Sequence, residues 1–323
     1  MLVTGATGFV GSHVAEALGR QGVVSRALVR PTSDVRRLAS AEIELAPGSL
    51  EEPASLRQAM EGVDVVVHLA ALTRAHTEEE YHRANVLGTR NLLDALLDAE
   101  PRPRRIVYVS SMAAVGPSLD DRPVAPADTP RPLTAYGRSK LAGEALCERA
   151  AGSVEVVILR APAVYGPRDR DLLHFFRLAA RGILPVPTGP ARPLQLVHVE
   201  DLADAVVIAA AGPAAGGIFH VAERTAYPWA VVGRLVADAM GSRARVVRVP
   251  EPMILWAARA SETIGRVTGR ASIFNRDKAR ELLAPGWLCD TESARRTLGF
   301  EARIPLAEGL RTTAEWYRTE GWL

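Results

Sequence analysis

Short apolar runs alternate with longer amphipathic segments along the first half of the chain. Runs rich in β-branched residues predict strands at 2–4, 25–29, 43–45, 63–69, 105–110 and 154–160. Apolar residues three or four positions apart predict helices at 12–20, 79–97 and 136–150. Such alternation is typical of βαβ units, which build a parallel sheet with helices on both faces. We therefore expect an α/β fold with a doubly wound parallel sheet.

The pattern changes in the second half of the chain. Residues 182–193 (GILPVPTGPARP) are rich in proline and glycine, which predicts an irregular connection. All five tryptophans lie in the last hundred residues. We interpret the chain as a larger domain at 1–167 and a smaller mixed α/β domain that takes up most of 168–323. Within 195–222, strands at 195–199 and 217–221 are expected to return to the main sheet.

Composition limits the kind of protein. The chain of 323 residues has 39 Lys and Arg against 37 Asp and Glu, a net charge of +2, so no nucleic-acid partner is expected. With 48% hydrophobic residues it can form a large core. Apolar stretches stay short of the roughly 18 residues that span a bilayer, and a predicted strand stands where a signal peptide would begin. We expect a cytoplasmic protein without an integral membrane segment.

Two residue types are scarce. Cys147 and Cys289 lie far apart and outside any cluster with metal-ligand spacing, so neither a disulfide framework nor a metal site is expected. Only Lys140 and Lys278 are lysines, which leaves 39 − 2 = 37 arginines. Any one arginine is therefore weak evidence for a site, whereas the position of a lysine is informative.

A glycine-rich turn lies directly between the first predicted strand and the first helix. Residues 4–11 read TGATGFVG, with Gly5, Gly8 and Gly11 three positions apart. Glycine lets the backbone turn sharply and approach a pyrophosphate at the helix N-terminus, where free amides favour an anion. A tight turn without a ligand is the alternative, which the strand-turn-helix context disfavours. The turn predicts a Rossmann-type dinucleotide-binding domain at 1–167.

The end of the second strand bears on the choice of dinucleotide. Val29 and Arg30 stand where a ribose-binding carboxylate is usual. A guanidinium pairs with a 2′-phosphate, which a carboxylate would repel. We therefore expect NADP(H), with NAD(H) as the alternative if Asp34 folds back toward the ribose.

A serine, a tyrosine and a lysine form the candidate reactive group. Tyr136 and Lys140 are four residues apart in TAYGRSK and therefore share one helix face. A nearby ammonium lowers the pKa of a phenol, and Ser111 can hydrogen-bond a substrate oxygen. An exposed helix turn with a solvated lysine is the alternative, which the scarcity of lysine disfavours. This arrangement predicts proton exchange by Tyr136 during hydride transfer from a nicotinamide.

Several motifs in order resemble an extended short-chain dehydrogenase/reductase of the NAD-dependent epimerase/dehydratase superfamily. They are TGATGFVG, VVHLAA (66–71), NVLGT (85–89), SSMAAVG, YGRSK, RAPAVYGPRD (160–169), LVHVEDLADA (196–205) and the ending GFEARIPLAEGLRTTAEWYRTEGWL. The resemblance implies a catalytic triad of Ser111, Tyr136 and Lys140, with Asn85 near the reacting groups. It also implies a homodimer packed through the helices that carry Asn85 and Tyr136. The residues that it assigns to the cofactor are Gly5, Thr7, Gly8, Phe9, Val10, Gly11, Arg30, Leu69, Ala70, Ala71, Tyr136, Lys140, Pro162 and Val164.

Departures from the family pattern narrow the expected reaction. Ser49 stands where many members have an adenine-binding Asp. Met112 and two alanines replace the acidic pair of nucleotide-sugar dehydratases, and Leu194 replaces a phosphate-binding Arg of epimerases, for which Arg192 is a candidate substitute. The pattern is more similar to 3β-hydroxysteroid dehydrogenase-like and dihydroflavonol reductase-like members, which act on a ketone or secondary alcohol of an apolar skeleton.

We therefore expect reversible hydride transfer between NADP(H) and a ketone or secondary alcohol on an apolar small molecule, with Tyr136 as acid/base. A nucleotide-sugar epimerase with tightly bound NAD is one alternative. A non-catalytic NADP(H)-sensing regulator is another, which the intact triad disfavours. Residues 253–267 predict a helix with an apolar stripe that forms core, lines the substrate pocket or lies on a membrane surface. Arg168 and Asp169 either face the substrate or form a loop ion pair.

Overall fold

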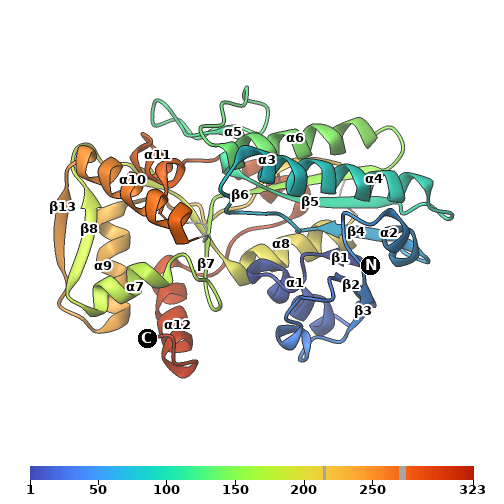
Figure 1. Ribbon diagram of the computed structural model, residues 1–323, viewed down its shortest axis with the longest axis horizontal. Helices are drawn as coiled ribbons and strands as arrows, with labels where there is room; N and C mark the ends of the chain where they lie inside the picture. Colours follow the sequence, from blue (N-terminus) through green and yellow to red (C-terminus); the bar gives the residue numbers. More distant parts are fainter. Residues whose placement is uncertain (214–215, 269–273) are drawn as a thin grey trace.

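The computed structural model describes residues 1–213, 216–268 and 274–323, and a parallel sheet runs through its centre (Figure 1). Within these residues the sheet has seven strands in the order β11-β6-β5-β4-β1-β2-β3. They are β1 (Leu2–Thr4), β2 (Ser25–Val29), β3 (Ile43–Pro47), β4 (Val65–His68), β5 (Arg105–Ser111), β6 (Glu155–Ala161) and β11 (Gly217–His220). The strand order changes direction between β1 and β4. Sheets of this type leave a ligand-binding crevice at that point, at the carboxyl ends of the strands.

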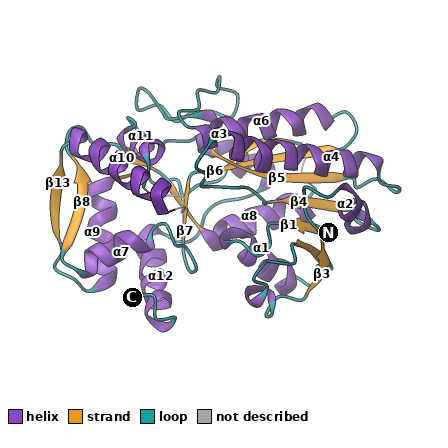
Figure 2. Cartoon of the chain, viewed as in Figure 1, coloured by secondary structure: helices purple, strands orange, loops and turns teal. Residues whose placement is uncertain are grey.

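Helices cover both faces of the sheet (Figure 2). Successive strand residues point to opposite faces, so Val65 and Val67 join one core cluster and Val66 joins the other. The first cluster packs against α1 (Phe9–Arg20) and α8 (Val199–Ala211). The second packs against α2 (Pro53–Met60), α4 (Gly88–Asp98) and α6 (Ala135–Ala150). Shorter helical segments of this part are η1 (Arg36–Leu38), α3 (Glu78–Tyr81), η2 (His82–Leu87) and α5 (Met112–Val115).

A second group of elements, here called the C-terminal lobe, lies beside the sheet, on the left in Figure 1. It comprises α7 (Leu173–Ala180), β8 (Ile183–Pro187), α9 (Trp229–Met240), β13 (Arg245–Val249), α10 (Glu251–Thr268), α11 (Arg276–Leu283) and α12 (Leu306–Thr319). The connecting elements are β7 (Ala163–Tyr165), β9 (Pro193–Leu194), β10 (Leu196–His198), β12 (Tyr227–Pro228) and η3 (Ala294–Leu298). Phe176, Val232 and Leu310 belong to its core. Across the described ranges, none of the helices combines the length and the apolar character that crossing a membrane requires.

The Rossmann-type α/β fold and its six predicted strands are confirmed, with strand ends shifted by at most two residues. The strand expected at 217–221 joins the sheet as β11, but the one expected at 195–199 does not, because β10 pairs with β7. The irregular connection expected at 182–193 is also partly wrong, since β8 pairs in parallel with β13. Its prolines fit because both strands of this pair are edges. The division at 167/168 stays a prediction.

Candidate active site

A cleft of about 1890 Å³ lies between the sheet and the C-terminal lobe. That volume exceeds the roughly 300–1,000 Å³ of an ordinary small-molecule site, so it leaves room for a dinucleotide and an extended second molecule. Every residue that the sequence assigned to cofactor or catalysis lines this cleft, with the exception of Asn85. Positions scattered over 160 residues of sequence therefore meet in one place.

The glycine turn is shaped by close backbone contacts. Gly5 has a φ of +76°, and a Cβ there would lie 2.6 Å from the nitrogen of Ala70. At Gly11 a Cβ would lie 2.1 Å from the Gly5 oxygen, so a larger residue cannot fit between strand and helix. Gly8 caps α1 without a side-chain hydrogen bond. The amides at the start of α1 are thus available to an anion, which fits the pyrophosphate of a dinucleotide.

A chain of buried hydrogen bonds fixes the floor of the cleft beside the glycine turn. Thr4 Oγ1 bonds to His68 Nδ1 at 2.7 Å and accepts from the Ala70 amide at 3.3 Å. His68 Nε2 bonds to Thr89 Oγ1 at 2.9 Å. Burial lowers the pKa of His68 to about 3, so the ring is neutral near pH 7. This network fixes the segment after β4, which includes Leu69, Ala70 and Ala71, without adding charge.

Asn85 lies behind the cleft wall instead of facing it. Its Nδ2 donates to the Ser139 hydroxyl at 2.8 Å and to the Leu72 carbonyl at 3.0 Å, while its Oδ1 accepts from the Leu72 amide at 2.6 Å. The residue sits in η2, a π-helical turn of the kind that often occurs at functional sites. Asn85 therefore ties the loop after β4 to α6, the helix that carries Tyr136, and acts on the cleft through its position.

Two arginines line the end of the cleft beside β2. Arg30, the predicted ligand of a 2′-phosphate, is exposed there, and Arg37 lines the same end. Burial and the positive charges of Arg170 and Arg168 lower the pKa of Arg37, which shows how closely these guanidinium groups gather. Arg37 carries no local sequence signal, because nothing nearby distinguishes it among the 37 arginines.

The nearby acids are already engaged. Both carboxylate oxygens of Asp34 accept from Arg36, at 2.9 and 2.6 Å. Arg168 lines the cleft and pairs with Glu16 at 2.6 Å, so its ion-pair partner is a residue of helix α1 and not of its own loop. Asp169, buried in the same wall, accepts from the amides of the two residues just before α7, and burial raises its pKa to about 7. The arginine end of the cleft thus keeps an excess of positive charge.

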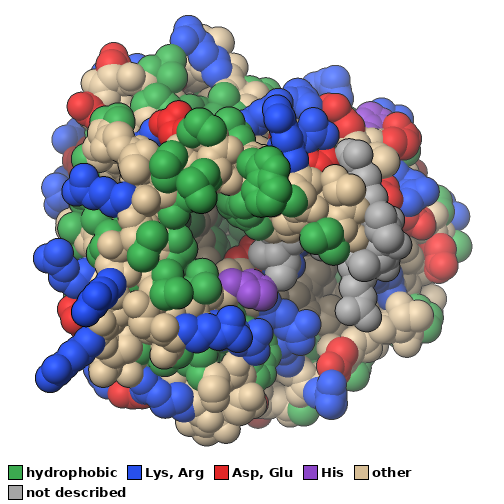
Figure 3. Space-filling model, turned by 60° about the vertical axis from the view of Figure 1, so that its left-hand side comes forward, with side chains coloured by type: hydrophobic (Ala, Val, Ile, Leu, Met, Phe, Trp, Pro, Cys, Tyr) green, Lys and Arg blue, Asp and Glu red, His purple; other side chains and the backbone are tan. Residues whose placement is uncertain are grey.

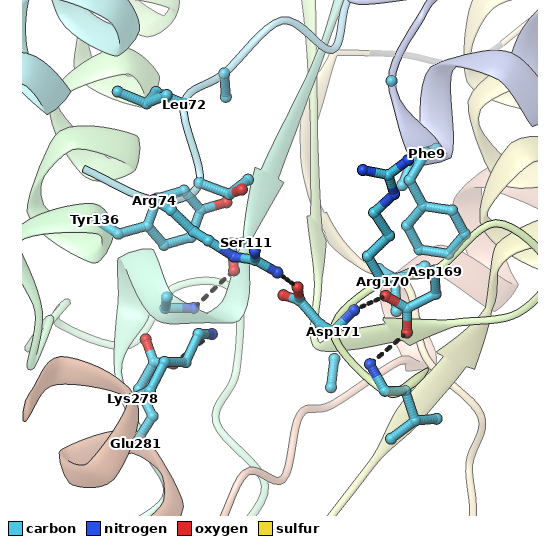
Figure 4. A pocket seen from close by; sticks show the side chains of 18 of the residues that line it. Phe9, Leu72, Arg74, Ser111, Tyr136, Asp169, Arg170, Asp171, Lys278 and Glu281 are labelled. Carbon is cyan, nitrogen blue, oxygen red and sulfur yellow. Dashed lines mark hydrogen bonds and ion pairs between the residues drawn. The ribbon is translucent and has the colours of Figure 1, made fainter. Parts of the chain in front are cut away.

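Tyr136 and Ser111 point into the middle of the cleft (Figure 4). Burial raises the pKa of Tyr136 to about 12, while the charge of Lys278 and hydrogen bonding to Ser111 act to lower it. The Ser111 hydroxyl also accepts from the Ala113 amide at 3.1 Å and so caps α5. The phenol is therefore a protonated donor at neutral pH, with a hydroxyl beside it.

Lys140 takes a different direction from the one the sequence suggested. Its ammonium donates to the Val109 carbonyl at 2.8 Å and lies 4.1 Å from the centre of the Tyr108 ring. Burial lowers the pKa of Lys140 to about 8, and Glu144 opposes that shift. The ammonium faces the floor of the cleft, while the cation that chiefly lowers the pKa of Tyr136 is Lys278.

Lys278 reaches the cleft from α11 of the C-terminal lobe (Figure 4). Its ammonium donates to Glu281 Oε2 at 2.8 Å, and Glu281 Oε1 accepts from the Thr134 hydroxyl at 3.3 Å. Asp277 accepts from the Ala135 amide at 3.1 Å. Thr134 and Ala135 begin the helix of Tyr136, so α11 is tied to the start of α6. Both lysines of the chain therefore line one cleft, although 138 residues separate them.

The wall formed by the lobe is mostly apolar. Phe175, Leu178, Trp229, Trp287 and several residues of α10 line it. Of the predicted stripe at 253–267, Ile254 and Ala258 form core, whereas Met253, Trp256 and Ile264 line the cleft and stay exposed; the side chains of Arg266 and Val267 lie outside the described residues.

Arg192, the candidate phosphate ligand, is buried away from this wall. Its guanidinium donates to the Thr188 carbonyl at 2.9 Å and to the Leu283 carbonyl at 3.2 Å, and it pairs with Glu251. Each of its three nitrogens therefore has a partner within the protein. Leu194, which stands in place of the family's arginine, does line the cleft.

A model of the NAD-dependent epimerase/dehydratase family matches residues 1–222. The chain belongs to this family, and it is an enzyme of the extended short-chain dehydrogenase/reductase type. It is 35% identical to a ceramide reductase of Caulobacter vibrioides over 323 residues, which cover 99% of this chain and 95% of the relative. It is 30% identical over 322 residues to 4-hydroxy-2-methyl-3-oxo-4-farnesyl-3,4-dihydroquinoline-1-oxide ketoreductase of Stigmatella aurantiaca, covering 95% and 93%.

Among solved structures, the chain resembles MoeE5 in complex with UDP-glucuronic acid and NAD, with a TM-score of 0.78, 28% identity and 99% coverage of both chains. Together these relatives support a nicotinamide-dependent oxidoreductase that acts on a small molecule. They include a ceramide reductase and a ketoreductase as well as a protein in complex with UDP-glucuronic acid and NAD. The relatives alone therefore leave the substrate class open.

Proposed function

We propose that the protein is an NADPH-dependent reductase of a ketone carried on a long-chain, lipid-like molecule. The observation that supports this most is the contrast across one cleft: Ser111 and Tyr136 face a wall of apolar side chains that includes Phe175 and Trp229. The ketone group of the substrate would lie beside Ser111 and Tyr136, and its hydrocarbon chain would lie along the apolar wall. The ceramide reductase and the farnesyl ketoreductase, both similar over nearly the whole chain, support the same substrate class.

The residues of the chain would divide the chemistry between them. When bound, the reduced nicotinamide supplies a hydride to the carbonyl carbon. Ser111 donates a hydrogen bond to the carbonyl oxygen, and the Tyr136 hydroxyl transfers its proton to that oxygen as the C–O group becomes an alcohol. Lys140 holds the nicotinamide ribose, and Lys278 stabilises the phenolate that Tyr136 leaves behind. Asn85 holds the loop after β4 in place against α6.

The cofactor would be held by its two ends. The turn at Gly5, Gly8 and Gly11, with Thr7, Phe9 and Val10, receives the pyrophosphate, and Pro162 and Val164 line the nicotinamide end. Arg30 and Arg37 pair with a 2′-phosphate. We favour NADPH over NADH because Asp34, which would bind a free 2′-hydroxyl, is held by Arg36 on both oxygens.

The epimerase alternative is less well supported. A nucleotide sugar brings two phosphates, and the cleft position of the family's arginine holds Leu194, while Arg192 is buried and each of its nitrogens bonds within the protein. We also propose that the protein forms a homodimer that packs through η2, α4 and α6. We propose a cytoplasmic location as well.

A substrate panel tests the proposal. Purified enzyme is given NADPH or NADH with a long-chain keto-lipid such as a 3-ketoceramide, a 3-ketosteroid, a short water-soluble ketone or UDP-glucose, and cofactor consumption and product are measured. We expect NADPH-dependent alcohol formation that becomes more efficient as the hydrocarbon lengthens. Conversion of UDP-glucose to its 4-epimer without net cofactor use, or equal rates with short and long ketones, would overturn the proposal.

A further inference from the structure

Helix α10 presents an apolar face to solvent at the mouth of the cleft. Its inner side, with Ile254 and Ala258, packs against Ala279 of α11. On another side Met253 is 60% exposed, Trp256 72% and Ile264 63%. The spacing of three and eleven residues from Met253 places all three on one helix face. Exposed apolar residues are ordinary when scattered, but three large ones that share a face and also line a cleft are not.

The surroundings of this face indicate that it belongs to the entrance of the cleft. Figure 3 shows hydrophobic side chains gathered around a hollow when the lobe is turned forward, with blue basic side chains outside them. We call Met253, Trp256 and Ile264 the α10 rim. The rim is therefore part of the entrance to the cleft and continuous with its apolar wall.

Arginines flank the α10 rim. Arg259 of α10 is exposed, and so is Arg245, which shares a face of β13 with Val249, a residue that packs against the core of α10. The acids of this stretch, Glu251 and Glu262, are both ion-paired, with Arg192 and Arg276 respectively. The rim thus combines an aromatic and two aliphatic side chains with a surplus of positive charge. This is the combination by which helices bind at the surface of anionic membranes.

We propose that the α10 rim and its flanking arginines form a docking surface for an anionic lipid bilayer. Met253, Trp256 and Ile264 enter the region between headgroups and acyl chains, and Arg245 and Arg259 bind lipid phosphates. A second copy of the chain fits this face less well, because a two-fold contact would bring the same arginines together. Docked in this way, the cleft opens toward the bilayer.

That orientation gives a route for the substrate, and this part of the inference rests on the proposed function. A lipid-like ketone has a low concentration in water, so an enzyme that acts on it gains from a path that avoids water. The hydrocarbon would pass along the rim and the apolar wall while the ketone advances to Tyr136. Docking itself needs neither cofactor nor substrate.

Vesicle co-sedimentation tests the docking surface. The whole enzyme, without cofactor or substrate, is mixed with phosphatidylcholine vesicles that contain or lack phosphatidylglycerol. We expect binding to the anionic vesicles that weakens with salt, and a loss of at least about tenfold in the partition coefficient for Met253→Gln/Trp256→Gln. The matched control is Val24→Gln, an exposed apolar residue (87%) at the other end of the molecule, which should bind like the parent. Equal binding by the rim variant and the control would overturn the proposal.

Two further measurements keep the test decisive. Arg245→Gln/Arg259→Gln should lose the salt-sensitive part of the binding. Quenching by bromine-labelled lipids should fall in Trp256→Phe if that indole enters the bilayer. Thermal unfolding shows whether each variant is folded. Sedimentation velocity that finds a dimer broken by the rim variant, with no vesicle binding by the parent, would assign the face to a second copy and overturn the inference. Vesicle binding that persists although no keto-lipid is reduced would defeat the proposed function and leave the docking surface standing.

Discussion

The two walls of the cleft hold their polar side chains in opposite ways. Directly behind the wall formed by the sheet, charged side chains are buried and fixed by several bonds: Glu144 accepts from Ser110, which lines the cleft, and forms a two-point pair with Arg160, and both charged groups are almost inaccessible. On the wall formed by the lobe, Lys278 and its partner Glu281 lie at an open surface, next to the exposed face of α10. The sheet side therefore holds its polar groups in fixed positions, whereas the lobe side leaves its polar groups accessible.

Chemistry needs reacting groups held in place, and a network of satisfied buried bonds supplies that rigidity. Admission of a long, flexible substrate needs an apolar surface that tolerates different shapes. We infer that the sheet wall determines the reaction and the lobe wall determines which molecule enters. Substitutions on the two walls should therefore differ in the quantity that they change.

The largest effect is expected at Tyr136. Tyr136→Phe removes the proton donor but keeps the ring, so turnover should fall by about 10²–10⁴-fold while the dissociation constant of NADPH stays close to that of the parent. Steady-state kinetics and a cofactor titration measure the two quantities. Tyr81→Phe is the matched control, because its ring lies 6.1 Å from that of Tyr136 and its hydroxyl bonds to the Thr73 carbonyl. A loss shared equally by both variants would contradict the assignment.

Breaking the buried pair should give the largest loss of stability. Arg160→Met leaves the Glu144 carboxylate buried without its cation, and we expect the free energy of unfolding to fall by about 3–5 kcal/mol. Urea unfolding followed by circular dichroism measures it. In the control, Arg311→Ala breaks an exposed pair with Glu315 on α12 and should cost less than about 0.5 kcal/mol. Similar losses in the free energy of unfolding for both variants would mean that the buried pair behind the sheet wall contributes no more to stability than an exposed pair.

The same contrast explains what the sequence could predict. Gly5, Gly11 and the Tyr136–Lys140 spacing are local patterns in the sequence, and all four residues line the cleft. Lys278 carries no such signal, because its place beside Tyr136 depends on how α11 docks onto α6, 142 residues away in sequence. The strand β8 was missed for a related reason: its prolines predict a loop unless the partner strand β13 is known.

A smaller effect, on cofactor choice, is expected from Arg37. Arg37→Ala removes a charged partner of a 2′-phosphate, so the dissociation constant of NADPH should rise by about tenfold while that of NADH changes little. Fluorescence titration with both cofactors measures the ratio. Arg20→Ala, an exposed arginine at the end of α1, serves as the control. Equal weakening of both cofactors would show that Arg37 supports the cleft without reading the phosphate.

The smallest effect is expected from Lys278, and it bears directly on the comparison of the walls. Its charge lowers the pKa of Tyr136 by stabilising the phenolate, so Lys278→Gln should raise that pKa. Alcohol oxidation requires the phenolate as base. The alkaline rise in its rate should therefore move to higher pH, and the rate below the midpoint should fall by up to roughly tenfold, which corresponds to one pKa unit. Ketone reduction, which uses the protonated phenol, should change less at neutral pH.

Two variants decide where the effect comes from. Lys278→Arg keeps the positive charge and should restore the parent pH profile, whereas Arg280→Gln, on the same helix and paired with Asp277, should leave the profile unchanged. If Lys278→Gln also leaves it unchanged, Lys140 alone governs the phenol, as the sequence first suggested, and the lobe wall takes no part in the chemistry. If the midpoint moves, the lobe supplies both the entrance and one charge, because α11 brings that charge to the start of the helix that carries Tyr136.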